Sequence, residues 1–175
     1  KSETGRRRLR HQAGGGGREV CASRATLIDI LLRNIFGLAQ ETARSTNEPA
    51  PMPLSLVALG GYGRNELNPG SDVDLMFLHG DKGAEIPLEV SRTVEQVLYP
   101  LWDVGFKVGH STRSPREAVT QATSEMLTKT ALLEARLPTG DEELYPLFRR
   151  RFRRPSWKGH RTEHSGAGKE KRGGR

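Results

Sequence analysis

Residues 54–78 read LSLVALGGYGRNELNPGSDVDLMFL, and the interpretation of the whole chain starts from this stretch. Two short apolar runs, Leu54–Leu59 and Val73–Leu78, flank a polar segment rich in glycine and asparagine. Apolar runs of this length, bounded by Gly, Pro and Asn, are typical of buried β-strands. The stretch therefore predicts two strands, joined by a connection that begins with a double glycine and ends with two aspartates.

Outside this stretch the pattern alternates between helical and extended segments. Apolar residues recur at helical spacing before it, and further helices and one more strand follow it. The predicted helices are 24–43, 86–104, 115–129 and 141–152, the third strand is 106–112, and 132–137 is compatible with either state. Alternation of this kind predicts a small α/β (α+β) domain, in which a mixed sheet is flanked by helices.

The aspartates at the start of the second strand suggest a metal site. Alternate side chains of a strand share a face, so Asp72 and Asp74 lie on one face about 6–7 Å apart. Two such carboxylates repel each other unless a cation lies between them, and Mg²⁺ is the hard cation that prefers oxygen ligands. Upstream, Gly60 and Gly61 allow a phosphate to approach the backbone, and Arg64 adds a positive charge.

Each of these features alone has a commoner explanation. An Asp-x-Asp pair usually marks the solvated face of a sheet, and Gly-Gly-Tyr-Gly is usually a turn. Their order and spacing change the interpretation, because a strand, a double glycine, a polar turn and Ser-Asp-x-Asp follow one another, with 11 positions from Gly61 to Asp72. This combination resembles the nucleotidyltransferase superfamily that includes DNA polymerase β.

The resemblance is closer to one family, the amino-terminal catalytic domain of the bacterial PII uridylyltransferases. It covers roughly residues 54–147 and rests on four separated blocks in the same order. These blocks are Gly60–Pro69, Ser71–Leu75, Pro100–His110 and Leu132–Arg136, the last followed by Gly140-Asp141. The resemblance implies a polymerase β-like nucleotidyltransferase fold and an enzyme.

The resemblance also implies a reaction and its metal ligands. The family transfers UMP from UTP to a tyrosine hydroxyl of the PII signalling protein and releases pyrophosphate, with two Mg²⁺ ions held by Asp72 and Asp74. Superfamily enzymes usually add a third carboxylate from a neighbouring strand. Glu134 is the candidate for it, and a surface glutamate paired with a nearby arginine on a helix is the equal alternative.

The same resemblance assigns the nucleotide-binding residues. Gly60 and Gly61 would cradle the triphosphate, and Ser71 and Arg64 would assist them. Lys107 lies in a shared block and is a further candidate phosphate ligand. The partners implied are UTP and the PII protein as acceptor.

The positive charge of the chain is concentrated at its two ends. The net charge is +7, but residues 1–24 carry +5 and residues 151–175 carry +7, which leaves −5 for residues 25–150. Segments rich in Gly, Ser, Arg and Lys bury too little apolar surface to fold. We therefore expect a basic disordered segment over 1–23, a nucleotidyltransferase domain over 24–150 and a basic low-complexity tail over 151–175, with nucleic acid an unlikely partner.

Other features bear on the compartment and the domain content. No apolar run approaches the roughly 18 residues of a membrane-spanning helix, and no secretory signal is recognisable. The lone Cys21 excludes an internal disulfide, and these observations predict a cytoplasmic protein without a membrane partner.

The family's hydrolase and ACT domains have no counterpart here, which predicts a truncated enzyme. The alternatives are a superfamily enzyme acting on a small molecule or an RNA end, and an inactive fragment that binds nucleotide or a partner.

Overall fold

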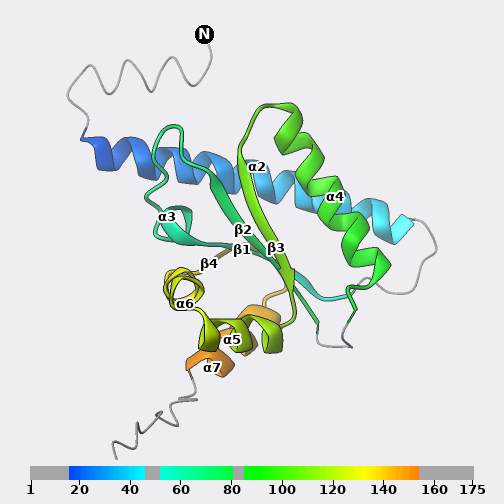
Figure 1. The fold of residues 1–175 in the computed structure, drawn as a ribbon. Coiled ribbons are helices and arrows are strands. Elements are labelled where there is room, and N and C mark those ends of the chain that lie inside the picture. Colours follow the sequence, from blue (N-terminus) through cyan, green and yellow to red (C-terminus); the bar gives the residue numbers. More distant parts are fainter. Residues whose placement is uncertain (1–15, 46–51, 81–84, 154–175) are drawn as a thin grey trace, which may run out of the picture.

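The computed structural model describes residues 16–45, 52–80 and 85–153, and it contains a four-stranded mixed sheet (Figure 1). The strands are β1 (Leu54–Ala58), β2 (Val73–His79), β3 (Val108–Arg113) and β4 (Arg136–Gly140), and their order in the sheet is β3-β2-β1-β4. β1 pairs antiparallel with β2 and with β4, whereas β2 and β3 are parallel. The α/β fold class is thereby confirmed, as are the two strands predicted from residues 54–78.

Helices cover both faces of this sheet. They are α2 (Gly17–Ser45), α3 (Gly60–Gly63), α4 (Leu88–Asp103), α5 (Pro115–Ser124), α6 (Met126–Leu133) and α7 (Leu144–Arg153). α2 and α4 pack on one face, where Leu75 and Phe77 point, and α5, α6 and α7 pack on the other, with Met76 and Leu78. Because both faces of β2 are buried after Asp74, the rest of the strand is apolar without alternation.

The first helix begins earlier than the sequence predicts. α2 starts at Gly17 rather than at residue 24, so residues 17–23 belong to the folded domain and not to the basic segment before it. The cause is burial, because Val20 and Cys21 are both only 8% exposed. The remaining predictions for the two basic ends, over residues 1–15 and 154–175, lie outside the described residues.

The helix predicted over residues 115–129 is two helices. α5 begins as expected, with Pro115 in its first turn and a capping box in which the Glu117 backbone N–H donates to Ser114 Oγ (3.3 Å) and the Ser114 N–H donates to Glu117 Oε2 (2.8 Å). Glu125 then adopts an extended conformation (φ −124°, ψ 116°) and separates α5 from α6. The ambiguous segment 132–137 is divided between the end of α6 and the start of β4.

Among the described residues, no helix has the length and the apolar character that crossing a membrane would require.

Candidate functional site

Asp72 and Asp74 stand at the beginning of β2, on the face opposite to Val73 and Leu75. Asp74 is the one exposed residue in an otherwise buried strand. Partial desolvation of its carboxylate raises the pKa of Asp74, and the negative charge of Asp72 raises it further. Among the described residues, neither carboxylate has a hydrogen bond or an ion pair. The two acids therefore form an uncompensated negative pair, as expected of carboxylates that hold a cation.

The surroundings of Asp74 are built from glycine. Gly60, the first residue of α3, has a φ of +54°, and a Cβ placed on it would lie 3.4 Å from Asp74 Oδ2. Leu59 leads into this turn, and its backbone N–H donates to the carbonyl oxygen of Asp74 (3.0 Å). The predicted phosphate cradle of Gly60 and Gly61 is thus a single helical turn beside the aspartates, where a bulky ligand meets little side chain.

Lys107 and Ser71 lie at the same end of the sheet as the aspartates. The backbone N–H of Val73 donates to the carbonyl oxygen of Lys107 (2.8 Å), and Val73 pairs with Val108. Lys107, which directly precedes β3, is therefore the neighbour of Asp72, which directly precedes β2. Ser71 closes a turn by donating from its hydroxyl to the Asn68 carbonyl oxygen (2.8 Å). The backbone of both residues therefore lies beside the aspartates, and their part in nucleotide binding stays a prediction.

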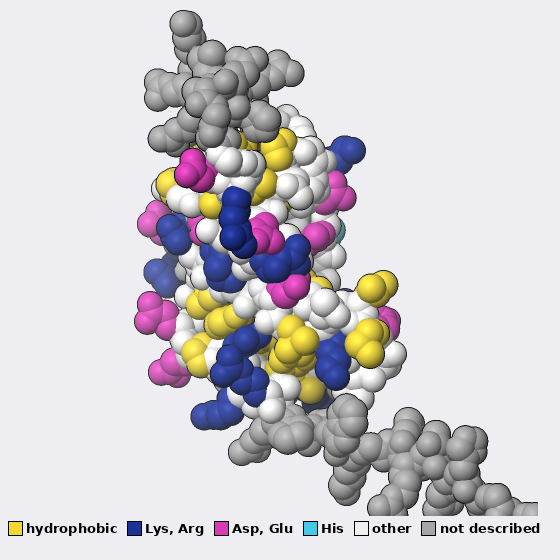
Figure 2. Space-filling model, turned by 90° about the vertical axis from the view of Figure 1, so that its left-hand side faces the viewer, with side chains coloured by type: hydrophobic (Ala, Val, Ile, Leu, Met, Phe, Trp, Pro, Cys, Tyr) yellow, Lys and Arg dark blue, Asp and Glu magenta, His cyan; other side chains and the backbone are white. Residues whose placement is uncertain are grey.

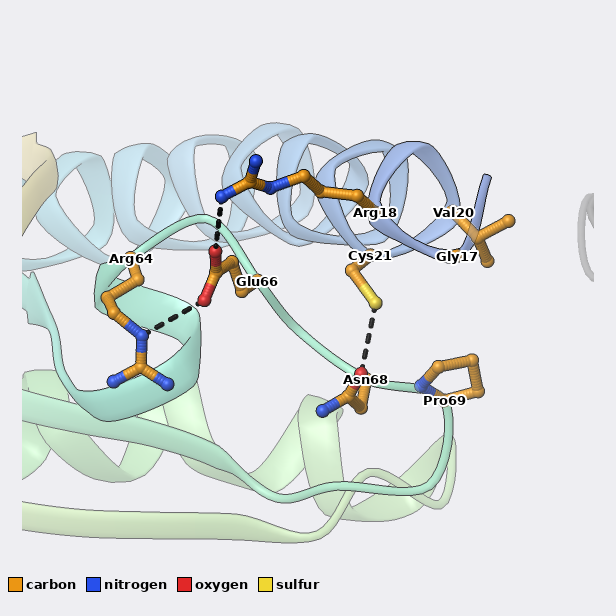
Figure 3. A pocket seen from close by; sticks show the side chains of 8 residues that line it. All are labelled: Gly17, Arg18, Val20, Cys21, Arg64, Glu66, Asn68 and Pro69. Carbon is orange, nitrogen blue, oxygen red and sulfur yellow. Dashed lines mark hydrogen bonds and ion pairs between the residues drawn. The ribbon is translucent and has the colours of Figure 1, made fainter. Parts of the chain in front are cut away.

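Arg64 and Glu134 interact with each other. Glu134 caps the end of α6 instead of lying on a strand, and its carboxylate is ion-paired with Arg64. Arg64 also donates from Nε to Glu66 (3.1 Å), which in turn accepts from Arg18 (3.4 Å) (Figure 3). Figure 2 shows basic and acidic side chains interleaved across the middle of this face. The arginine that pairs with Glu134 comes from the segment after α3, 70 positions away in sequence, and not from the helix that Glu134 ends.

The fit of a metal ion follows from these contacts. No group of three or more His, Cys, Asp or Glu side chains in the described ranges is arranged to hold a metal, and the Glu134 carboxylate is paired with Arg64. Asp72 and Asp74 still suit Mg²⁺, because their oxygens have no hydrogen bond or ion pair within the described residues and the two charges repel each other. The residues present fit a cation bound by two protein carboxylates.

The Glu134 assignment can be tested with the variant Glu134→Gln. The Arg64 and Glu134 side chains are partly exposed, so losing their ion pair should lower stability by only roughly 0–1 kcal/mol. Because Glu134 is paired with Arg64 and not placed with the aspartates, we expect the Mn²⁺ affinity of the variant to stay within about twofold of wild type, as for loss of a group that binds no metal. Electron paramagnetic resonance titration with Mn²⁺ measures this affinity. A loss as large as that in Asp72→Asn would instead make Glu134 a metal ligand.

A pocket of about 370 Å³ lies between the first turn of α2 and the segment that follows α3 (Figure 3). It is lined by Gly17, Arg18, Val20, Cys21, Arg64, Glu66, Asn68 and Pro69. The Cys21 thiol donates to Asn68 Oδ1 (3.1 Å) and ties the helix to the segment. Of the predicted nucleotide-binding residues, only Arg64 lines this pocket.

The sequence interpretation missed a buried ionic cluster behind the glycine turn. Asp29 of α2 accepts hydrogen bonds from the Tyr62 hydroxyl (2.6 Å) and from two nitrogens of Arg136 (2.6 and 3.0 Å). Arg136 also stacks over the Tyr62 ring, with 5.3 Å from its guanidinium carbon to the ring centroid, and burial raises the pKa of Tyr62. The cluster joins α2, α3 and β4, and so fixes the turn that carries Gly60 and Gly61.

One sequence signal could have identified this cluster. Asp29 stands four residues after Ala25 and three before Leu32, on the apolar stripe of the predicted helix. A carboxylate on a buried stripe needs a partner, because an unpaired buried charge is very costly.

Comparison with known proteins places these features in a family. The family model described as "Putative nucleotidyltransferase DUF294" matches residues 10–131. Three curated proteins named bifunctional uridylyltransferase/uridylyl-removing enzyme are similar to the chain. The one from Erythrobacter litoralis is 42% identical over 137 residues, which are 78% of this chain and 15% of that protein.

The other two relatives agree with the first. The Rhodospirillum rubrum protein is 38% identical over 148 residues (84% of this chain, 15% of that protein). The Rhodopseudomonas palustris protein is 41% identical over 134 residues (75% of this chain, 14% of that protein). The chain thus spans about 15% of the length of the relatives it matches.

Proposed function

The chain belongs to the DUF294 nucleotidyltransferase family, and on that basis we propose that it transfers UMP from UTP to a tyrosine hydroxyl of a PII-type signalling protein. The phosphoester bond forms between the tyrosine oxygen and the α-phosphorus, the bond from that phosphorus to the β-phosphate bridging oxygen breaks, and pyrophosphate leaves. The uridylyl group is carried over from the names of the relatives, and the PII acceptor is carried over from the family resemblance alone. The catalytic domain would comprise the described segments between residues 17 and 153.

Asp72 and Asp74 are proposed to hold Mg²⁺, which supplies charge stabilisation to the phosphates and lowers the pKa of the attacking hydroxyl when bound. The two carboxylates would hold the cation at the start of β2, and without a cation they would repel the triphosphate. Gly60 and Gly61 let the triphosphate approach the α3 backbone. Lys107, beside Asp72, would neutralise part of the phosphate charge. Most of the rate acceleration then comes from positioning and electrostatics.

Arg64 has a less direct place in this proposal. Its guanidinium already has two carboxylate partners, Glu66 and Glu134, and their hydrogen bonds raise the pKa of Arg64. A guanidinium has five N–H donors, so it can keep these partners and still donate to a phosphate oxygen. Ser71 would act mainly through the turn that it closes with Asn68.

One observation carries the proposal. The Asp72–Asp74 pair lies beside glycine backbone with no hydrogen bond or ion pair to a described residue, at the end of the sheet where the nucleotide is expected. A merely solvated pair on a sheet face would not need the adjacent backbone to be free of side chains.

The proposal is tested by incubating the purified chain with Mg²⁺, a PII protein and either UTP or ATP, and measuring the intact mass of PII. We expect PII to gain the mass of one UMP with UTP, and no gain without Mg²⁺. A gain of AMP with ATP would instead support a different base preference. Labelling of RNA ends or of a small molecule, with PII unchanged, would support the other acceptors considered from the sequence. Mg²⁺-dependent UTP binding without any transfer would indicate an inactive nucleotide-binding domain.

A further inference from the structure

We infer that Gly109 of β3 is a positioning residue, which holds the Asp74 carboxylate in place by leaving its own side-chain position empty. Gly109 and Asp74 are partners in the parallel register of β3 and β2. A Cβ on Gly109 would lie 2.5 Å from Asp74 Oδ1 and 3.7 Å from its Cγ. Real Cβ atoms do not approach an oxygen this closely, so any other residue at this position would displace the carboxylate.

The geometry follows from how strands pair. Partner residues on neighbouring strands project side chains from the same face, side by side. Here the Asp74 carboxylate occupies the space in which a side chain at position 109 would stand. It therefore lies across the backbone of β3, and this backbone contributes to the burial of its oxygens.

A second glycine closes the other side of the same carboxylate. Asp74 Oδ2 lies 3.4 Å from the Cβ position of Gly60, so the two oxygens face two different residues without side chains. The two glycines come from separate elements, α3 and β3, on either side of β2 along the sheet. We call this arrangement, formed by Gly60, Asp74 and Gly109, the glycine slot.

The neighbours of Gly109 show that the strand itself does not require glycine. Lys107 and Ser111 lie two residues before and after it, on the same face by strand alternation, and both carry polar side chains. The only residue of the three without a side chain is the one opposite Asp74. The requirement therefore comes from the carboxylate and not from the strand.

The inference rests on the proposed metal site, and its first test is metal binding without turnover. Mn²⁺ affinity of the purified chain is measured by electron paramagnetic resonance for wild type, Gly109→Ala and Gly37→Ala. Gly37 lies on α2, and a Cβ there meets no atom within 4 Å, so this variant is the matched control. We expect Gly109→Ala to weaken Mn²⁺ binding about 10- to 100-fold, the range for residues that orient metal ligands, and Gly37→Ala to leave it unchanged.

The second test is a double-mutant cycle on thermal stability in metal-free buffer. Gly109→Ala should change Tm less favourably in the wild-type background than in the Asp74→Ala background, because only in the former must its methyl group displace the Asp74 carboxylate. In the Asp74→Ala background the same substitution should cost little, because the conflicting atoms are gone. If Gly109→Ala alone does not fold, recovery of folding in the double variant supports the inference.

The possible outcomes separate the two proposals. Failure of the wild-type chain to bind Mn²⁺ would overturn the metal site and this inference with it. Wild-type binding together with unchanged affinity in Gly109→Ala would overturn the inference alone. An equal loss of Tm from Gly109→Ala in both backgrounds would also overturn it, since the strand and not Asp74 would then require glycine.

Discussion

Asp74→Asn should reduce UMP transfer by at least about 10³-fold, the scale on which loss of a group that stabilises transition-state charge acts, and should at the same time raise the stability of the metal-free protein. The pKa of Asp74 is raised in the folded state, so at neutral pH its negative charge opposes folding. Asparagine keeps the shape of the side chain and removes that charge. A gain in Tm of up to about 3 °C is expected.

The pH dependence of this gain identifies its cause. The folded protein binds a proton on Asp74 more tightly than the unfolded chain does, so the destabilisation by the ionised form grows as pH rises through the interval between the two pKa values. The gain in Asp74→Asn should be full at pH 7 and shrink toward zero as pH falls to about 4, the ordinary pKa of aspartate. Differential scanning calorimetry over this pH range measures it.

Asp103→Asn provides the matched control, because Asp103 is an exposed acid at the end of α4. It should leave both transfer and Tm unchanged. Transfer that persists at near wild-type rate in Asp74→Asn would contradict the proposed metal role, whatever happens to stability.

The second large effect is expected from Arg136→Met, which removes the guanidinium but keeps much of the stem. Asp29, whose side chain is 11% exposed, would then lose two hydrogen bonds and remain as a buried carboxylate. Breaking a buried ion pair by removing one partner costs about 3 kcal/mol or more. Urea unfolding, followed by circular dichroism, should show this loss of unfolding free energy.

The comparison variant is Arg33→Met, at the same carboxylate. The Arg33 guanidinium lies 3.9 Å from Asp29, and its side chain is 55% exposed. Arg33 also donates from Nε to the Pro138 carbonyl oxygen (3.0 Å). We expect Arg33→Met to lower the free energy of unfolding by about 1 kcal/mol, as for exposed ion pairs and single hydrogen bonds. Equal losses in the two variants would mean that Arg136 does not carry the cluster.

The parts of the fold that local pattern determines could be predicted from the sequence. Val73–His79 is recognisable as a strand because its apolar run is short and bounded by turn residues, and burial on both faces explains the run. Pro115 and Ser114 mark the start of α5 through their own chemistry. The break at Glu125 carries no such mark, because neither glycine nor proline stands there.

The candidate site divides in the same way. Sequence spacing brings Asp72, Asp74, Gly60 and Gly61 to one place, because strand alternation and a short connection fix their positions. The pairing of Glu134 with Arg64 joins residues 70 positions apart, and the contact of Gly109 with Asp74 depends on the register of two parallel strands. A single sequence holds no local signal for either of these contacts, so only the structure could reveal them.

The cluster around Asp29 has a consequence for how the protein is made. Arg136 follows Asp29 by 107 residues, so during synthesis α2 leaves the ribosome long before its partner on β4 exists. Contacts of such high sequence separation form slowly and late, since the long intervening loop must first close. Until then the apolar stripe of α2 has no β4 beside it, and a nascent chain at this stage is a natural client for chaperones. Completion of the glycine turn through Tyr62 is thereby tied to the last strand of the sheet to be translated.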